Sequence, residues 1–341
     1  MPPTIKDVAR IACVSPSTVS RVIADHPLIS AATKERVRAA MRDLDYHPNA
    51  IARSLVRQSS HTLGLILSRS AEQAFLNPFF PEIIRGISSV AREHQYSLLL
   101  STSKTIEQEH AECLQMLHAR RVDGVILLAS RRHDALVERL LLEKHPFVVV
   151  GRVPGQPGVS WVNNDNVAAA EAAVKHLVEA GRRRVGFIGG PDDFVVTEDR
   201  LEGYKRALQA AGIEFDAALV RYTDFSKESG ENAAASLVSL PLSLRPTAIF
   251  AADDLLALGA LLAGRAAGLR IPENLALVGF NDNPIASYLE PGLTSVQISI
   301  FDLGQRAAEL LIALLRDKGG SPAQVILPAR LVVRGSSALT A

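Results

Sequence analysis

The first side chains that could do chemistry are a run of hydroxyls and one guanidinium near the N-terminus. Directly after Ser15, the run comprises Pro16, Ser17, Thr18, Ser20 and Arg21. Arginine pairs bidentately with guanine in the major groove of DNA, and serine and threonine hydroxyls bond base edges or phosphates. The run is therefore a candidate DNA-contacting surface. The alternative is the solvated face of an ordinary helical domain, because short helices of this kind are common.

Three short helices are expected to position this run. Apolar residues recur at the spacing of one helix face over residues 5–12. Ser15 is a suitable N-cap and Pro16 a suitable first residue for a second helix, which is expected to end near Ile23. Ser30 is the expected cap of a third. Three helices with a tight turn after the first predict a helix-turn-helix headpiece.

The charge is distributed unevenly along the chain of 341 residues. Residues 1–60 contain nine Lys and Arg against five Asp and Glu, a net charge of +4, so that the remainder carries −3 within a total of +1. A basic segment joined to a mildly acidic body is typical of a polyanion-binding module attached to another domain.

The remainder of the chain has the pattern of an α/β domain. Apolar, strand-like runs occur at 62–67, 97–101, 124–128, 147–150, 185–188, 248–250, 275–280 and 329–333. Helical stretches lie between them at 81–93, 107–120, 167–180, 200–211, 227–238 and 254–267. This alternation predicts parallel sheets with crossover helices. About 270 residues exceed an ordinary single sheet, so two lobes are expected.

Several function classes find no support in the sequence. The chain lacks an apolar stretch long enough to span a membrane and a signal peptide, so a cytoplasmic protein is expected. Gly189-Gly190-Pro191 matches no phosphate-binding glycine motif, and no G-x-S-x-G elbow occurs, so an enzyme is not expected. His110 and Cys113 share a predicted helix face, but His118 is two turns away, so neither a metal nor a cofactor is predicted.

Motifs along the chain resemble those of the lactose-repressor (LacI/GalR) family of transcriptional regulators. The matching stretches are TIKDVA (4–9), VSPSTVSRV (14–22), YHPNAIARSL (46–55), NPFF (77–80), RVDGVI (121–126), DRLEGY (199–204) and PGLTSV (291–296). They run in the same order across essentially the whole chain. The resemblance implies an α+β multidomain protein: a headpiece at 1–48, a hinge helix and linker at 49–61, and a two-lobed, periplasmic-binding-protein-like α/β domain with parallel sheets at 62–341.

The resemblance also implies which headpiece residues meet operator DNA. Pro16, Ser17 and Arg21 fall where the family contacts the major groove, with Thr18 beside them. Phosphate contacts are implied for Thr4, Ser20, Ser30, Thr33, Tyr46 and Asn49. The hinge helix, 49–57, includes Ala52 and Leu55, the apolar wedge implied to enter the minor groove. Two positions depart from the pattern: Cys13 stands in a turn that favours a small residue and positive φ, and Val56 replaces a basic or small residue.

In the larger domain, the resemblance implies a small effector held between two lobes. The first lobe is expected to comprise about 62–161 and 294–322, and the second about 162–293 and 323–335. The implied effector-binding residues are Asn77, Phe79, Phe80, Arg200, Phe225, Asp253 and Asn281. Amides, a carboxylate and a guanidinium suit sugar hydroxyls, and phenyl rings suit the apolar face of a pyranose. The alternatives are core packing for the two adjacent phenylalanines and a structural ion pair of Arg200 with Asp199 or Glu202.

The effector is expected to be a sugar. Stretches at 77–82, 162–166, 224–225 and 279–282 resemble the maltose-operon repressor branch of the family most, so maltose or a maltodextrin is the first expectation. The amide of Asn281, where many members have Asp, favours a neutral ligand. A purine or phosphorylated corepressor is the alternative, and a cytosolic sugar-binding protein or enzyme on the same core is a remote one.

A homodimer on a pseudo-palindromic operator is also expected, because one headpiece contacts only a few base pairs.

Overall fold

The computed structural model describes residues 3–23, 25–46, 59–68, 70–317 and 320–338, which form two compact units. The first unit comprises residues 1–61 and the second residues 62–341. The hinge helix predicted for 49–57 and the contacts predicted for Asn49, Ala52 and Leu55 lie outside the described residues. Among the described helices, none has the length and apolar character needed to cross a membrane.

The N-terminal unit contains the three predicted helices, α1 (Ile5–Ile11), α2 (Pro16–Ile23) and α3 (Ala31–Asp43). Each expected cap is present: the Ser15 hydroxyl accepts the amide N–H of Thr18 at 3.1 Å, and that of Ser30 accepts the amide of Thr33 at 3.3 Å. The helices pack around a small buried core of Val8, Ala9, Ala12, Val19, Val22, Val37 and Ala40. Cys13, in the turn between α1 and α2, has the positive φ that was anticipated, 51°.

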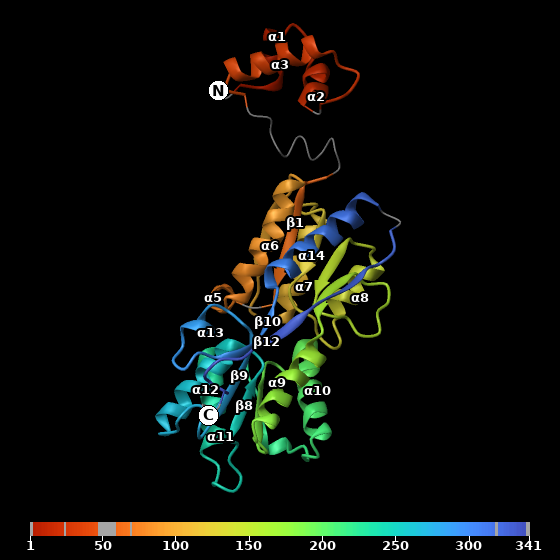
Figure 1. Cartoon of the computed structure of the whole chain (residues 1–341). Helices are drawn as coiled ribbons and strands as arrows, with labels where there is room; N and C mark the ends of the chain where they lie inside the picture. Colours follow the sequence, from red (N-terminus) through yellow and green to blue (C-terminus); the bar gives the residue numbers. More distant parts are fainter. Residues whose placement is uncertain (1–2, 24, 47–58, 69, 318–319, 339–341) are drawn as a thin grey trace. The chain divides into compact units, whose positions relative to one another are not determined.

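The first lobe of the second unit is built on a six-stranded sheet with the order β11-β5-β4-β3-β1-β2. All of its described strand pairs are parallel. Its strands are β1 (Thr62–Leu67), β2 (Ser97–Thr102), β3 (Gly124–Leu127), β4 (Phe147–Val150), β5 (Trp161–Asn164) and β11 (Gln324–Leu327). Helices α6 (Phe79–Glu93) and α14 (Ile300–Arg316) cover one face, and α7 (Ile106–His118) and α8 (Ala135–Leu142) cover the other. The short α5 (Ala71–Leu76) precedes α6 (Figure 1).

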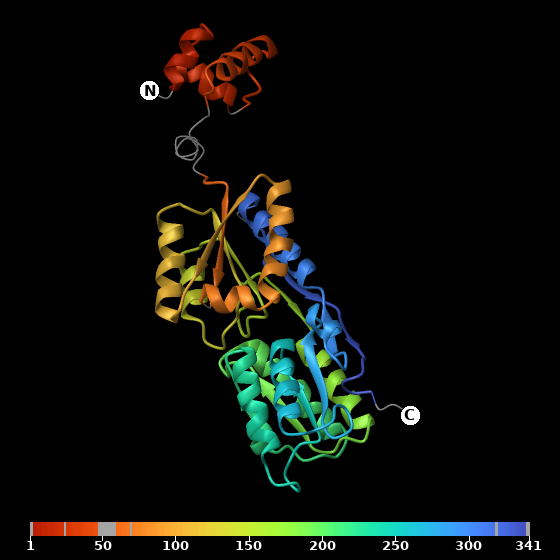
Figure 2. The same ribbon diagram turned by 90° about the vertical axis from the view of Figure 1, so that its left-hand side faces the viewer.

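The second lobe repeats this architecture with the sheet order β12-β10-β9-β8-β6-β7, in which only the β10–β12 pair is antiparallel. Its strands are β6 (Val185–Gly189), β7 (Val220–Tyr222), β8 (Ala248–Ala251), β9 (Ala276–Asn281), β10 (Thr294–Ile298) and β12 (Ala329–Val332). Helices α9 (Asn166–Glu179) and α10 (Val195–Ala210) lie on one face, and α11 (Lys227–Val238) and α12 (Asp254–Ala266) on the other. Two short helices, η1 (Ala217–Leu219) and α13 (Ile285–Tyr288), complete it. In Figure 2, helices lie on both sides of the sheet of this lobe, which is coloured green to light blue.

The chain passes between the lobes three times, and this corrects the predicted lobe boundaries. Residues 294–298 were assigned to the first lobe, but they form β10 in the second sheet; residues 324–327 were assigned to the second lobe, but they form β11 in the first. Residues 162–164 likewise belong to the first sheet, in β5. A short apolar strand carries no mark of which sheet it joins, because its partners are distant in sequence.

Pairs of helices cross at glycines in both lobes. On α6 and α14, a Cβ atom added at Gly86 would lie 2.1 Å from the carbonyl oxygen of Phe301, and one added at Gly304 would lie 2.2 Å from that of Ile83. A Cβ atom added at Gly203 of α10 would likewise lie 2.2 Å from the carbonyl oxygen of Val167 in α9. No side chain fits at these crossings, so the glycines set the approach of each helix pair and thereby the shape of each lobe.

Gly304→Ala is expected to lower the free energy of unfolding by about 1–3 kcal/mol, because the added methyl group forces α6 and α14 apart. Gly158→Ala is the matched control, since a Cβ at Gly158 meets nothing within 4 Å. Chemical denaturation of both variants checks this. Equal stability of the two variants would show that the crossing tolerates a methyl group.

Candidate functional sites

Helix α2 presents a polar, exposed surface on the headpiece. Val19 and Val22 are buried in the core, whereas Pro16, Ser17 and Arg21 are exposed. Thr18 and Ser20 are half-buried beside them. The helical period therefore separates the apolar and polar positions as predicted, and the polar face points to solvent.

Arg21 differs from most basic residues of the headpiece. Arg10 pairs with Asp7 at 3.0 Å, Lys34 and Arg38 pair with Asp25, and Arg42 pairs with Glu35 at 2.8 Å. Within the described part of the headpiece, Arg21 takes part in no such ion pair. Its guanidinium is thus available for an external acceptor.

The other predicted phosphate contacts lie at the helix ends. The backbone N–H and hydroxyl of Thr4 bond the Asp7 carboxylate at 3.0 and 2.7 Å, and the Ser30 hydroxyl bonds that of Thr33. Thr4 and Ser30 are exposed, Thr33 is half-buried, and Tyr46 packs partly against the headpiece core. These groups are available at the surface, but the structure leaves their DNA contacts as a prediction.

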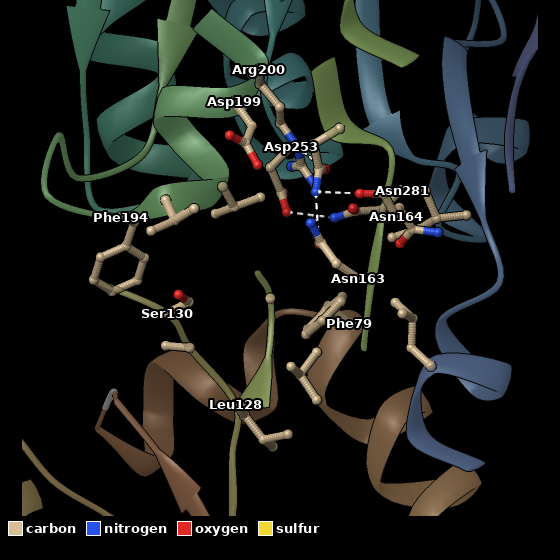
Figure 3. Close-up of a pocket in the computed structure, with 18 of the residues that line it drawn as sticks. Phe79, Leu128, Ser130, Asn163, Asn164, Phe194, Asp199, Arg200, Asp253 and Asn281 are labelled. Atoms are coloured by element: carbon tan, nitrogen blue, oxygen red, sulfur yellow. Dashed lines mark hydrogen bonds between the residues drawn. The ribbon is translucent and has the colours of Figure 1, made fainter. Parts of the chain in front are cut away.

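A cavity lies between the two lobes and encloses about 820 Å³ of empty space, open mouth included. All seven predicted effector-binding residues line it: Asn77, Phe79, Phe80, Arg200, Phe225, Asp253 and Asn281. The polar side chains gather toward the second lobe and Phe79 and Leu128 toward the first (Figure 3). A concave site with apolar walls and a few converging polar groups is typical of small-molecule sites.

The guanidinium of Arg200, in a side chain from α10, is a buried charge in the cavity wall. Its Nε donates to Asn166 Oδ1 at 3.0 Å, its Nη1 donates to the carbonyl of Ala252, and its Cζ lies 3.6 Å from the ring centroid of Phe280. Burial lowers the pKa of Arg200 to about 10, against the opposing effect of nearby carboxylates, first among them that of Asp253. The group stays charged at neutral pH, and three of its five N–H donors remain beyond these two bonds.

This geometry excludes the proposed structural ion pair of Arg200 with Asp199 or Glu202. Asp199 instead bonds Arg152, and Glu202 bonds Arg206 at 2.8 Å. Adjacent residues on a helix point in different directions. Arg200 therefore points to Asn166 and the carbonyl of Ala252, while Asp199 points to Arg152 of the first lobe.

Asp253 joins amides from both lobes. It follows β8 and caps α12, where its Oδ1 accepts the amide N–H of Leu255 at 2.7 Å. Its Oδ2 accepts the Nδ2 protons of Asn77 at 3.2 Å and of Asn281 at 2.9 Å. The Oδ1 of Asn281 is buried and has no hydrogen-bond partner within the described ranges. A buried acceptor left in this state requires a donor from a ligand or water.

The apolar walls are aromatic. Phe79 and Phe80 meet edge to face with ring centroids 5.3 Å apart. Phe80 also belongs to the buried core and Phe79 packs against it, so core packing and cavity lining are compatible here. Phe225 and Asn281 have φ of +66° and +104°, values that cost energy for residues other than glycine and that concentrate at functional sites.

The two lobes touch across the mouth of the cavity. Arg152, from the loop after β4, donates through Nε to both carboxylate oxygens of Asp199 at 2.8 Å. The loop after β3 hydrogen-bonds the loop after β6 through its backbone, with Val195 N donating to Ser130 O and Arg132 N to Asp193 O at 3.0 Å. The two lobes are therefore in direct contact beside the cavity.

Several lining residues were not predicted. Arg152, Asn163, Asn164, Asn166, Asp199, Ser130 and Phe194 all line the cavity. The asparagine-rich segment after residue 162 stood out in the sequence as a motif without an assigned role. Because strands of a parallel sheet end at one edge, a polar run just after a strand was the signal available.

Comparison with known proteins matches the two units to two families. Residues 4–49 match bacterial regulatory proteins of the lacI family, and residues 174–337 match a periplasmic binding protein-like domain. The transcriptional regulator CelR of Thermobifida fusca is 38% identical over 336 residues, 98% of either chain. The chain belongs to the LacI family.

It is accordingly a DNA-binding transcriptional regulator with an effector-binding domain, and its relatives are regulators, not enzymes. MalR of Streptococcus pneumoniae is 37% identical, covering 93% of this chain and 94% of MalR, and CytR of Escherichia coli is 33% identical, covering 98% and 96%. Since these relatives are similarly close, the maltose branch is not singled out.

Two solved structures cover nearly the whole chain. A CelR–cellobiose complex superposes with a TM-score of 0.77 at 36% identity, covering 98% of this chain and 99% of that one. The lac repressor dimer bound to operator and the anti-inducer ONPF superposes with a TM-score of 0.86 at 28% identity and covers 99% of each chain.

The ion pair of Arg152 and Asp199 is expected to stabilise the contact between the lobes. The Asp199 side chain is 4% exposed, so a double-mutant cycle with Arg152→Ala and Asp199→Asn should give a coupling free energy of about 1–3 kcal/mol in chemical denaturation. Arg132 and Glu198 span the same lobes at 3.9 Å with side chains 52% and 44% exposed. That control cycle should give about 0.5 kcal/mol or less. Equal couplings would contradict the assignment.

Proposed function

We propose that this regulator is a repressor that binds a pseudo-palindromic operator as a homodimer and releases it when a neutral sugar occupies the cavity. The observation that carries the proposal is the cavity between the lobes, where a buried guanidinium and an incompletely bonded amide face aromatic walls. Solved structures of relatives support both parts of the proposal. The lac repressor dimer bound to operator supports operator binding, and the CelR–cellobiose complex supports a sugar ligand.

The charges around the cavity favour a neutral ligand. The charged lining residues are Arg152, Asp199, Arg200 and Asp253, which balance in sign. A phosphorylated or strongly cationic ligand would bring in a charge that these pairs do not offset. Hydroxyl groups of a sugar can accept from Arg200 and donate to Asn281 Oδ1, while a pyranose face packs on phenyl rings.

A disaccharide of glucose is the form of sugar that the relatives support best. CelR, in its complex with cellobiose, is 36% identical in sequence. The sequence motifs that resemble the maltose-operon repressor branch keep maltose and maltodextrins in the same group. These compounds present the same ring hydroxyls and differ in linkage. The polar end of the cavity suits the shared ring, and the linkage sets where the second ring meets the first lobe.

Closure of the lobes offers a route to the DNA-binding unit. Strand β1 begins at Thr62, directly after the linker, so movement of the first lobe moves the point at which the chain leaves it. In a dimer, movement of the two first lobes would change the distance between the points at which the two chains leave them. Paired hinge helices would form at only one such distance. An effector then shifts the equilibrium by its different affinity for the two states, typically about 1–3 kcal/mol.

Isothermal titration calorimetry with cellobiose, maltose and monosaccharides, followed by operator titrations with each ligand, tests the effector. We expect a glucose disaccharide to bind and to weaken operator binding by about 5–150-fold. Arg200→Ala should weaken sugar binding by about 10–100-fold while operator binding persists. Arg206→Ala, on the exposed side of the same helix, is the matched control.

A purine and a phosphorylated sugar belong in the same calorimetric panel. Tight binding of either of them, with no sugar bound at about millimolar concentration, would contradict the sugar proposal. Equal loss of sugar and operator binding in Arg200→Ala would make Arg200 a structural residue.

Arg21→Ala is expected to relax base selection at one position in each half-site, at a cost of about 1–3 kcal/mol per contact. Arg36→Ala removes the same charge from an exposed position on α3 and should leave the selected sequence unchanged. Selection of binding sites from a random DNA pool, read for both variants, measures this. An unchanged sequence preference in Arg21→Ala would place base recognition elsewhere.

A further inference from the structure

A cluster of two histidines and a glutamate lies on the first lobe, apart from the cavity residues. His118 Nε2 lies 2.8 Å from Glu143 Oε2, and His145 Nε2 lies 3.1 Å from the same oxygen. One ligand atom from each of the three residues falls within 4.8 Å of the others. None of the three lines the cavity.

The ends of two helices bring these side chains together. His118 is the last residue of α7, and Glu143 is the C-cap of α8. Lys144 has a φ of +56°, and the N–H of His145 bonds the carbonyl of Leu140 at 3.0 Å, which turns the chain back so that His145 meets Glu143. Both helices pack their apolar sides into one buried cluster, so the position of their ends is set by the core.

One carboxylate oxygen of this cluster is not engaged by the neighbouring arginine. The Glu143 side chain is 24% exposed, and its Oε2 faces the Nε2 atoms of both imidazoles at 2.8 and 3.1 Å. Arg139 Nε holds Oε1 at 2.6 Å, which leaves Oε2 as the oxygen that faces both imidazoles. The C-terminal ends of two helices add partial negative charge at the same place.

We propose that His118, Glu143 and His145 bind a divalent first-row transition ion of the zinc type. Imidazole and carboxylate ligands at about 2.0–2.2 Å in tetrahedral geometry lie about 3.3 Å apart, close to the two N–O distances here. Two imidazoles select such ions over Mg²⁺ and Ca²⁺, which prefer oxygen ligands. The His118 side chain is 52% exposed, so it can rotate toward the ion and leave a coordination position for water.

The arrangement differs from the one weighed in the sequence, which grouped His118 with His110 and Cys113. Cys113 is buried, and burial raises the pKa of its thiol to about 12, which removes it as a thiolate ligand. His110 lies 3.8 Å from Asp134. Glu143 and His145, the neighbours of His118 in the structure, lie 25 and 27 positions later in the chain. No local spacing in the sequence therefore indicated them.

Calorimetry of the full-length, tag-free protein with ZnCl2 tests the site, with MgCl2 as the comparison ion. We expect one Zn²⁺ per chain with a Kd on the order of 1 µM or tighter, and no Mg²⁺ binding in that range. His118→Gln, His145→Gln and Glu143→Gln should each weaken Zn²⁺ binding about tenfold or more. His133→Gln, at an exposed histidine of the same lobe, should leave it unchanged.

Electron paramagnetic resonance of the wild-type chain with one equivalent of Cu²⁺ gives a measurement that does not depend on variant folding. Hyperfine splitting from two imidazole nitrogens is the expected result. The proposal is overturned if Zn²⁺ binds wild type no more tightly than the three variants, or if the Cu²⁺ spectrum shows no pair of imidazole nitrogens.

Discussion

The buried guanidinium of Arg200 is the constraint on which the cavity depends. A charge with a 5% exposed side chain is stable only where fixed dipoles and carboxylates surround it. Asn166 at the start of α9, the carbonyl of Ala252 after β8 and the face of Phe280 in β9 supply that environment. Ala252 and Phe280 lie at the carboxyl ends of neighbouring parallel strands of the second sheet, which share one edge, and Asn166 reaches this edge directly from β5 of the first sheet.

Closure of the cavity depends on the first lobe meeting this edge with matching groups. Asn77 donates to Asp253, and Arg152 bonds Asp199, so each lobe supplies one side of both contacts. A ligand between them would compete with or complete such contacts, which would link occupancy of the cavity to the arrangement of the lobes. That coupling is the physical basis of an effector-controlled regulator.

In the headpiece, one small core sets the direction of the exposed side chains of α2. Val19 and Val22 face inward on α2, and the helical period then turns Ser17 and Arg21 outward. Arg10, Lys34, Arg38 and Arg42 are engaged by carboxylates of the headpiece itself, whereas the donors of Arg21 take part in no ion pair within the described residues. Local sequence is sufficient for this arrangement because all its contacts lie within one short segment.

The sequence by itself determined the local features: the three headpiece helices with their Ser15 and Ser30 caps, the alternation of strands and helices, and the residues of the cavity that family motifs mark. Their physical basis is periodicity and capping, which act over a few residues. Only the tertiary structure decided which sheet β10 and β11 join, that Asp199 pairs with Arg152 and not Arg200, and that His118 meets Glu143 and His145. Those outcomes depend on contacts between segments distant in the chain, and no local pattern encodes them.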